Sequence, residues 1–223
     1  FDKWSSKNKY YLVTGSDLPK TEEQVPLVYL ERAEGLFTCC GNQFWREGNT
    51  KQWPMEWKLI YDNKFKPPQN LLTYLGEELR MSDYPVKAGN HIEDRGSMVN
   101  FSIVGRNCTQ VQREDYYRYD NLVDERKKIS KHIKEQWLKI DAVIGGQISI
   151  DIYPKGNDKS QILDIIEQER LVQPDEYIFI GDGIDNKGND YPLAKLMGKR
   201  DDCSSFNTDG WKHTQKILEK LSD

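Results

Sequence analysis

Long apolar runs are absent from this sequence, and so is an excess of positive charge. No stretch approaches the roughly 20 apolar residues that a helix needs to cross a bilayer, so the sequence predicts no membrane-spanning helix. The 36 acidic residues outnumber the 32 lysine and arginine residues, which gives a net charge of −4. This balance excludes a general positive field of the kind that holds nucleic acid or an anionic membrane, and we expect neither as a partner.

Cysteine and histidine are scarce. Cys39 and Cys40 are neighbours among only four cysteines, and adjacent cysteines fit neither an ordinary disulfide framework nor the spacing of a zinc clasp. The three histidines have no ligand spacing. We therefore expect reduced thiols and a cytoplasmic protein.

The remaining composition is that of a globular protein. Hydrophobic residues make up 37% of the 223 residues and charged residues 30%, which is too apolar for a disordered chain. A chain of this length can form one large domain or two modest ones, each with a buried core.

The two ends of the chain have the pattern of parallel α/β structure. Residues 9–13 form a β-branched and aromatic run that stops at polar turn residues before a helical pattern. Residues 162–166 carry apolar side chains at helical spacing, and the nearly all-apolar run 177–180 follows them. This order predicts a helix and then a buried strand.

The middle of the chain has a different pattern. Pro67 and Pro68 open a helical pattern, and a long charged helix is predicted over residues 121–139. Alternating or apolar runs at 98–104 and 142–152 predict strands of an antiparallel sheet. The economical arrangement is one core domain made from both ends of the chain, with a second domain inserted in the middle.

Two short loops rich in glycine and acidic residues follow the apolar run at 177–180. They read Gly181-Asp182-Gly183 and Gly188-Asn189-Asp190. Open α/β sheets bind ligands at the carboxyl ends of their strands, and carboxylate or amide oxygens favour a hard cation such as Mg2+ over zinc. Asp182, Asn189 and Asp190 are therefore candidate metal ligands, with an ordinary turn as the simpler alternative.

Other polar groups are predicted at the same sheet edge. Lys159 lies at the start of the helix before the buried strand, where its ammonium group could bind a transferred phosphoryl group; a solvated surface charge is the alternative. Thr14 and Ser16 follow the first strand and add hydroxyl groups. In this order, hydroxyl, lysine and acidic loop resemble the second, third and fourth motifs of haloacid dehalogenase (HAD) phosphotransferases.

Three arginines in the middle of the chain extend the resemblance. Arg95, Arg106 and Arg113 are separated by 11 and 7 residues. Their surroundings are Asp94-Arg95-Gly96-Ser97-Met98-Val99-Asn100, Gly105-Arg106-Asn107-Cys108 and Gln112-Arg113-Glu114, and a Gly145-Gly146-Gln147-Ile148-Ser149 element follows. With these spacings the sequence closely resembles the cap domain of eukaryotic-type phosphomannomutases, and the resemblance runs from residue 13 to residue 190.

The resemblance implies an architecture and an activity. It implies a HAD-like α/β core with a Rossmann-type parallel sheet, formed by residues 1–56 and 156–223, and an inserted α+β cap of antiparallel sheet and helices over residues 57–155. It also implies an intramolecular phosphotransferase that interconverts mannose 6-phosphate and mannose 1-phosphate through an aspartyl phosphate. Mg2+, a hexose 1,6-bisphosphate activator and a homodimer formed through the cap belong to the same expectation.

The chemistry of a bisphosphate intermediate explains the arginines. While one phosphate meets the metal site, the other needs a cationic clamp, and guanidinium groups bind phosphate oxygens in pairs. Ser149 and Asp151 lie two apart on a predicted strand and so share a face, where they can bind phosphate or sugar hydroxyls. Ordinary ion pairs with acidic residues are the alternative role for these arginines.

One element of the resemblance is missing. HAD phosphotransferases begin with a strand that ends in Asp-x-Asp-Gly-Thr, whose first aspartate is the nucleophile, and no such motif occurs in this sequence. Because Phe1 is not an initiator methionine, we expect a trimmed chain rather than a degenerate enzyme, and weak binding of Mg2+. A sugar-phosphate phosphatase and a non-catalytic sugar-phosphate binding protein stay as alternatives.

Overall fold

The computed structural model describes residues 1–48, 56–169, 174–185 and 188–221. The chain divides into two compact units. Unit 1 consists of Phe1–Asn63 and Asn157–Asp223, and unit 2 consists of Lys64–Gly156. Across the described ranges, every helix is too short or too polar to span a bilayer.

The strands of unit 1 form two sheets. In the first sheet, β1 (Tyr11–Val13) pairs in parallel with β2 (Gly35–Thr38), and β3 (Gln43–Glu47) and β4 (Trp57–Asp62) follow as antiparallel neighbours. In the second, β9 (Tyr177–Gly181) pairs in parallel with β10 (Cys203–Asn207). The two apolar runs near the ends of the chain are therefore parallel strands. The predicted burial of residues 177–180 is wrong, because Ile178 is 42% exposed and the other residues of β9 are only partly buried.

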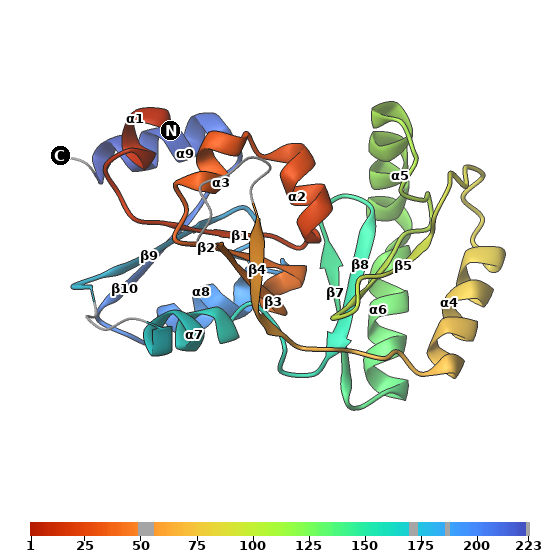
Figure 1. Ribbon diagram of the computed structural model, residues 1–223. Helices are drawn as coiled ribbons and strands as arrows, with labels where there is room; N and C mark the ends of the chain where they lie inside the picture. The colour runs from red at the N-terminus through yellow and green to blue at the C-terminus, as the bar shows by residue number, and fades with distance from the viewer. Residues whose placement is uncertain (49–55, 170–173, 186–187, 222–223) are drawn as a thin grey trace. The chain divides into compact units, whose positions relative to one another are not determined.

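Helices cover these sheets on both sides. In Figure 1 the strands β1, β2, β9 and β10 lie between one layer of helices, α1 (Asp2–Ser5), α2 (Leu18–Gln24), α3 (Leu27–Glu31) and α9 (Trp211–Lys220), and another, α7 (Gln161–Glu169) and α8 (Tyr191–Met197). A short 3-10 turn, η1 (Cys39–Gly41), joins β2 to β3. Ile162 of α7 packs on Phe37 and Phe44, while the next residue, Leu163, packs with α8 and β9. One helix thus contributes to the cores of both sheets.

Asn42 joins the two places where the chain leaves and re-enters unit 1. Its side chain is fully buried, and its Nδ2 donates a hydrogen bond of 2.9 Å to the carbonyl of Asn157. The Nδ2 of Asn63 donates to Asn42 Oδ1 at 3.2 Å. A buried amide needs such partners, so this position fixes both segments on the core.

Unit 2 is an antiparallel sheet with helices. The strand order is β5 (Ile92–Asp94), β6 (Val99–Phe101), β8 (Ser149–Pro154) and β7 (Ile140–Gly145). Its helices are α4 (Gln69–Met81), α5 (Gln110–Val123) and α6 (Glu125–Gln136), which lie on one face of the sheet in Figure 1. Apolar side chains from that face and from the helices form one core that includes Leu75, Tyr116, Ile133 and Ile150.

The prediction of one long helix over residues 121–139 is wrong. Asp124 adopts a left-handed conformation with φ of 56°, which ends α5 and starts α6. Aspartate tolerates this conformation better than most residues. Asp120 accepts a hydrogen bond of 2.8 Å from the backbone N–H of Arg126, which supplies a partner to the first turn of α6.

Candidate functional site

A row of polar side chains crosses the sheet face of unit 2 that points away from the helices. Glu93 of β5 lies opposite Asn100 of β6, which lies opposite Asp151 of β8. Because side chains alternate along a strand, these three residues share a face and their apolar neighbours point into the core. Asn100 Nδ2 donates to Asp151 Oδ1 at 2.7 Å, and both residues are buried. Asn100 Oδ1 is buried without a hydrogen-bond partner among the described residues.

Two of the predicted arginines meet at this row. Glu93 Oε2 lies 2.7 Å from Arg95 Nη2 and 3.3 Å from Arg106 Nε. Arg106 Nη1 also donates to Ser149 Oγ at 3.3 Å. The structure therefore brings Arg95, Arg106 and Ser149 together, and Asp151 lies two residues along the same strand face as Ser149.

The third arginine adds to the positive charge of this cluster. Arg113 lies in the first turns of α5, where its N–H donates to the carbonyl of Thr109. Burial lowers the pKa of Arg106 below its ordinary value, and the carboxylates of Glu93 and Asp151 oppose this shift. The charges of Arg95 and Arg113 lower the pKa of Arg106 further. The three guanidinium groups repel one another, so their clustering is favourable only where anions balance their charge.

Arg126 holds the loop that carries Ser149. Its side chain is buried, and Nε donates to Asp120 Oδ2 at 2.8 Å. Its Nη1 donates to the carbonyls of Gly146 at 2.9 Å and Ser149 at 3.4 Å. Neither Glu93 nor Arg126 was predicted from the sequence, because no local pattern separates them from the many other charged residues of this segment.

Thr14 and Ser16 lie in a turn at the carboxyl end of β1. The N–H of Thr14 donates to the backbone carbonyl of Phe37 at 2.9 Å, and Thr14 Oγ1 accepts from the N–H of Ser16 at 3.0 Å. Asp17 Oδ1 accepts from the N–H of Lys20 at 3.1 Å and caps α2. The turn is therefore held by β2 and by the start of a helix, which fixes the two hydroxyl-bearing residues at the strand end.

Lys159 and Asp190 form a buried ion pair. Lys159 Nζ lies 2.5 Å from Asp190 Oδ1 and 3.3 Å from Asn189 Oδ1, and the paired side chains are only 6% and 5% exposed. The N–H of Gly183 donates to Asp190 Oδ2 at 3.0 Å. A Cβ atom at Gly181 would lie 2.5 Å from the same oxygen, so only glycine fits there. The interpretation of Lys159 as a solvated surface charge is wrong.

The oxygen groups of the acidic loops suit a hard cation better than zinc. Asp182 directly follows the last residue of β9 and is exposed, so its carboxylate is open to a ligand. Both carboxylate oxygens of Asp190 already have partners, as does Asn189 Oδ1. Within the described ranges, no three His, Cys, Asp or Glu side chains are grouped to hold a metal ion. Asp182 is thus the donor that best fits Mg2+ among the predicted ligands.

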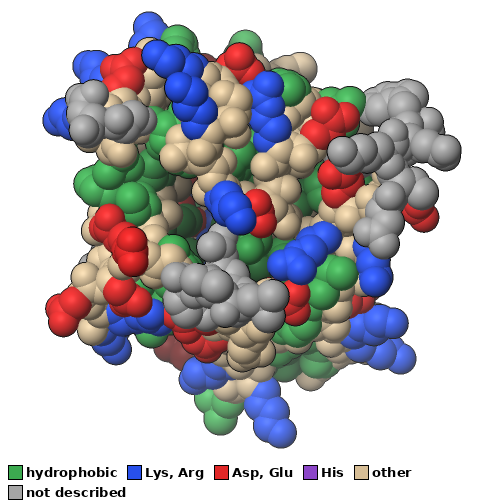
Figure 2. Space-filling model, turned by 60° about the vertical axis from the view of Figure 1, so that its left-hand side comes forward, with side chains coloured by type: hydrophobic (Ala, Val, Ile, Leu, Met, Phe, Trp, Pro, Cys, Tyr) green, Lys and Arg blue, Asp and Glu red, His purple; other side chains and the backbone are tan. Residues whose placement is uncertain are grey.

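Charge on the surface is mixed. On the face drawn in Figure 2, lysine and arginine side chains lie among acidic ones, without a continuous area of either sign. This distribution agrees with the net charge of −4 and with the absence of a general positive field.

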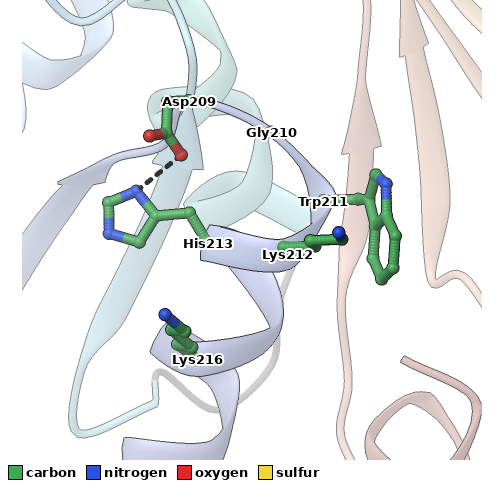
Figure 3. A pocket seen from close by; sticks show the side chains of 6 residues that line it. All are labelled: Asp209, Gly210, Trp211, Lys212, His213 and Lys216. Atoms are coloured by element: carbon green, nitrogen blue, oxygen red, sulfur yellow. Dashed lines mark ion pairs between the residues drawn. The ribbon is translucent and has the colours of Figure 1, made fainter.

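A separate surface pocket of about 530 Å3 lies at the start of α9. Figure 3 shows its lining, which includes Trp211, Lys212 and Lys216, and the ion pair in which His213 Nδ1 lies 3.1 Å from Asp209 Oδ1. It contains none of the residues that the sequence analysis singled out, so it is not the candidate site.

The fold is shared with a known structure. A haloacid dehalogenase-like hydrolase from Bacteroides thetaiotaomicron matches with a TM-score of 0.55 and 14% identity, over 99% of this chain and 89% of that protein. At this identity the similarity concerns the fold alone. The predicted HAD-like α/β fold with an antiparallel α+β part is confirmed.

The chain is more similar in sequence to proteins of one family. The family model of eukaryotic phosphomannomutase matches residues 1–221. The phosphomannomutase of Encephalitozoon cuniculi (strain GB-M1) is 35% identical over 212 residues, which are 94% of this chain and 80% of the relative. That of Galdieria sulphuraria is 33% identical over 204 residues, 84% of this chain and 73% of the relative. The chain described here therefore belongs to the eukaryotic phosphomannomutase family.

Proposed function

We propose that this protein acts as a phosphomannomutase, interconverting mannose 6-phosphate and mannose 1-phosphate through an aspartyl phosphate and a hexose bisphosphate. The observation that carries the proposal is the arginine cluster of unit 2, where Arg95 and Arg106 meet Ser149 on a buried polar sheet face. A mutase must retain a bisphosphate between two half-reactions, so it needs a second phosphate site beyond the one where transfer occurs. A simple phosphatase has no such need.

In this proposal the two units have different tasks. Unit 2 acts as the cap, where Arg95, Arg106 and Arg113 bind the distal phosphate and Ser149 and Asp151 bind the phosphate or the sugar hydroxyls. Unit 1 acts as the catalytic core.

In the core, Lys159 stabilises negative charge on the transferred phosphoryl group, and the hydroxyl groups of Thr14 and Ser16 orient it. Asp182 would hold Mg2+, with Asn189 and Asp190 as further predicted ligands; the bound ion would supply positive charge that neutralises the phosphoryl oxygens. The acceptor of the phosphoryl group would be the first aspartate of an Asp-x-Asp-Gly-Thr motif, which this sequence does not contain.

The proposed function also involves an activator, a homodimer and a reducing compartment. Hexose 1,6-bisphosphate is the proposed activator, since it supplies the phosphoryl group that starts the cycle. Homodimer formation through unit 2 is supported by Val111 and Leu122 of α5, which are 67% and 85% exposed. All four cysteines are free, which supports a reducing compartment such as the cytoplasm.

The activity is tested with mannose 1-phosphate, Mg2+ and a trace of hexose 1,6-bisphosphate. The chain as printed and the same chain preceded by an Asp-x-Asp-Gly-Thr strand are compared, and mannose 6-phosphate and free phosphate are followed together. We expect bisphosphate-dependent isomerisation only with the added strand, and its loss in Asp182→Asn. Release of phosphate without isomerisation would identify a phosphatase, and binding without turnover in both chains would identify a binding protein.

A further inference from the structure

The carboxylate of Glu93 contacts two of the three predicted phosphate-binding arginines. A single carboxylate oxygen, Oε2, lies 2.7 Å from Arg95 Nη2 and 3.3 Å from Arg106 Nε. Arg95 and Arg106 themselves are largely buried, with side chains 4% and 19% exposed. At this burial an ion pair is held far more firmly than at the surface.

The position of Glu93 in the sheet explains this contact. Glu93 pairs directly with Asn100, and Asn100 pairs with Asp151, so all three side chains rise from the same face across three strands. Arg95 lies two residues after Glu93, and its N–H donates to the carbonyl of Met98 across the turn. Strand register therefore places the carboxylate between Arg95, which directly follows β5, and Arg106, which lies in the loop after β6.

We propose that Glu93 is a positioning residue for the distal phosphate: its shared oxygen holds the guanidinium groups of Arg95 and Arg106 at a fixed separation. This inference rests on the proposed function and deepens it. Two unshielded guanidinium groups repel each other, and a long flexible side chain loses entropy when a ligand must order it. Glu93 removes both costs before the ligand arrives.

A simple electrostatic role for Glu93 would have the opposite sign. A negative charge near an anion site weakens binding, so neutralising Glu93 would tighten the binding of phosphate if the carboxylate only reduced the local positive charge. Neutralising it would weaken binding if the carboxylate positions the arginines. The two roles are therefore separated by the direction of one measured change.

The experiment measures the affinity of the chain for mannose 6-phosphate by calorimetric titration in wild type, Glu93→Gln and Asp94→Asn. Asp94→Asn is the matched control, because it removes the same charge from the next position on the strand and retains an oxygen that can accept from Gly96. We expect Glu93→Gln to weaken binding about tenfold or more, since charge-assisted bonds to two guanidinium groups are lost. Asp94→Asn should stay within about twofold of wild type.

A second measurement keeps the test informative if Glu93→Gln changes stability. The Nε–Hε signal of Arg106, assigned with Arg106→Ala, should shift or broaden in Glu93→Gln and stay in place in Asp94→Asn, under conditions where each variant is folded. Equal or tighter binding by Glu93→Gln, or an unchanged Arg106 signal, would overturn the positioning role. Failure of the wild type to bind, or wild-type affinity in Arg106→Ala, would instead reject the phosphate site on which the inference rests.

Discussion

The buried ion pair of unit 1 and the arginine cluster of unit 2 differ in how their charges are balanced. In unit 1, Lys159 and Asp190 form a pair of one positive and one negative group at 2.5 Å. In unit 2, one oxygen of Glu93 serves both Arg95 and Arg106. Buried charge is costly unless it is paired, so the balanced pair stabilises the folded loops, whereas the cluster with excess positive charge is arranged for an anion.

Three substitutions test the roles of buried polar groups in the two units, ordered by their expected effect on the free energy of unfolding. The largest effect is expected for Lys159→Met, which leaves the Asp190 carboxylate buried without its cation. We expect a loss of about 3–5 kcal/mol in urea denaturation. Lys131→Met is the control: that side chain is 76% exposed and pairs with Glu135 at 3.8 Å, so its removal should cost less than about 1 kcal/mol.

A double variant sharpens this prediction. Lys159→Met combined with Asp190→Asn should regain much of the lost stability, because no unpaired charge is then left in the interior. Equal stability of Lys159→Met and Lys131→Met would contradict this prediction, because it would mean that the buried pair does not stabilise the acidic loops.

An intermediate effect is expected for Asn42→Ala in unit 1. This change removes the amide that bonds to Asn157 and Asn63, and it leaves the carbonyl of Asn157 without this donor. We expect a loss of about 1–3 kcal/mol, measured in the same denaturation experiment. Asn121→Ala, on the exposed side of α5, should change stability by less than about 0.5 kcal/mol. Equal effects of the two changes would show that Asn42 is not an anchor.

Much of the fold was predictable because it depends on local patterns. The run 177–180 is a parallel strand, as its continuous apolar residues predict, and the polar loop after it lies at the carboxyl end of β9 as expected. Its burial was not predicted correctly, since Ile178 is exposed. The break at Asp124 was not predictable. The charged, periodic residues on both sides of it all favour helix, and the left-handed turn depends on the bonds between Asp120 and Arg126.

The candidate site was predictable only in part. Arg95, Arg106 and Arg113 were found because their spacing matches a family pattern. Glu93 was not found, since its importance comes from strand register: it lies opposite Asn100, and a shift of one residue would turn its side chain to the other face. The sequence also left open whether Lys159 is buried, because a lysine at a helix start is most often exposed.

The most direct test of the account is one variant measured in two ways. Arg106→Ala should lower the affinity for mannose 6-phosphate by about 10- to 150-fold, because charge-assisted hydrogen bonds contribute about 1.5–3 kcal/mol. The same variant should change the free energy of unfolding by less than about 1 kcal/mol, the smallest effect of the three substitutions, because loss of the contact with Glu93 is offset by relief of the repulsion from Arg95 and Arg113. A clear loss of stability with unchanged affinity would contradict the account and assign Arg106 to a structural ion pair.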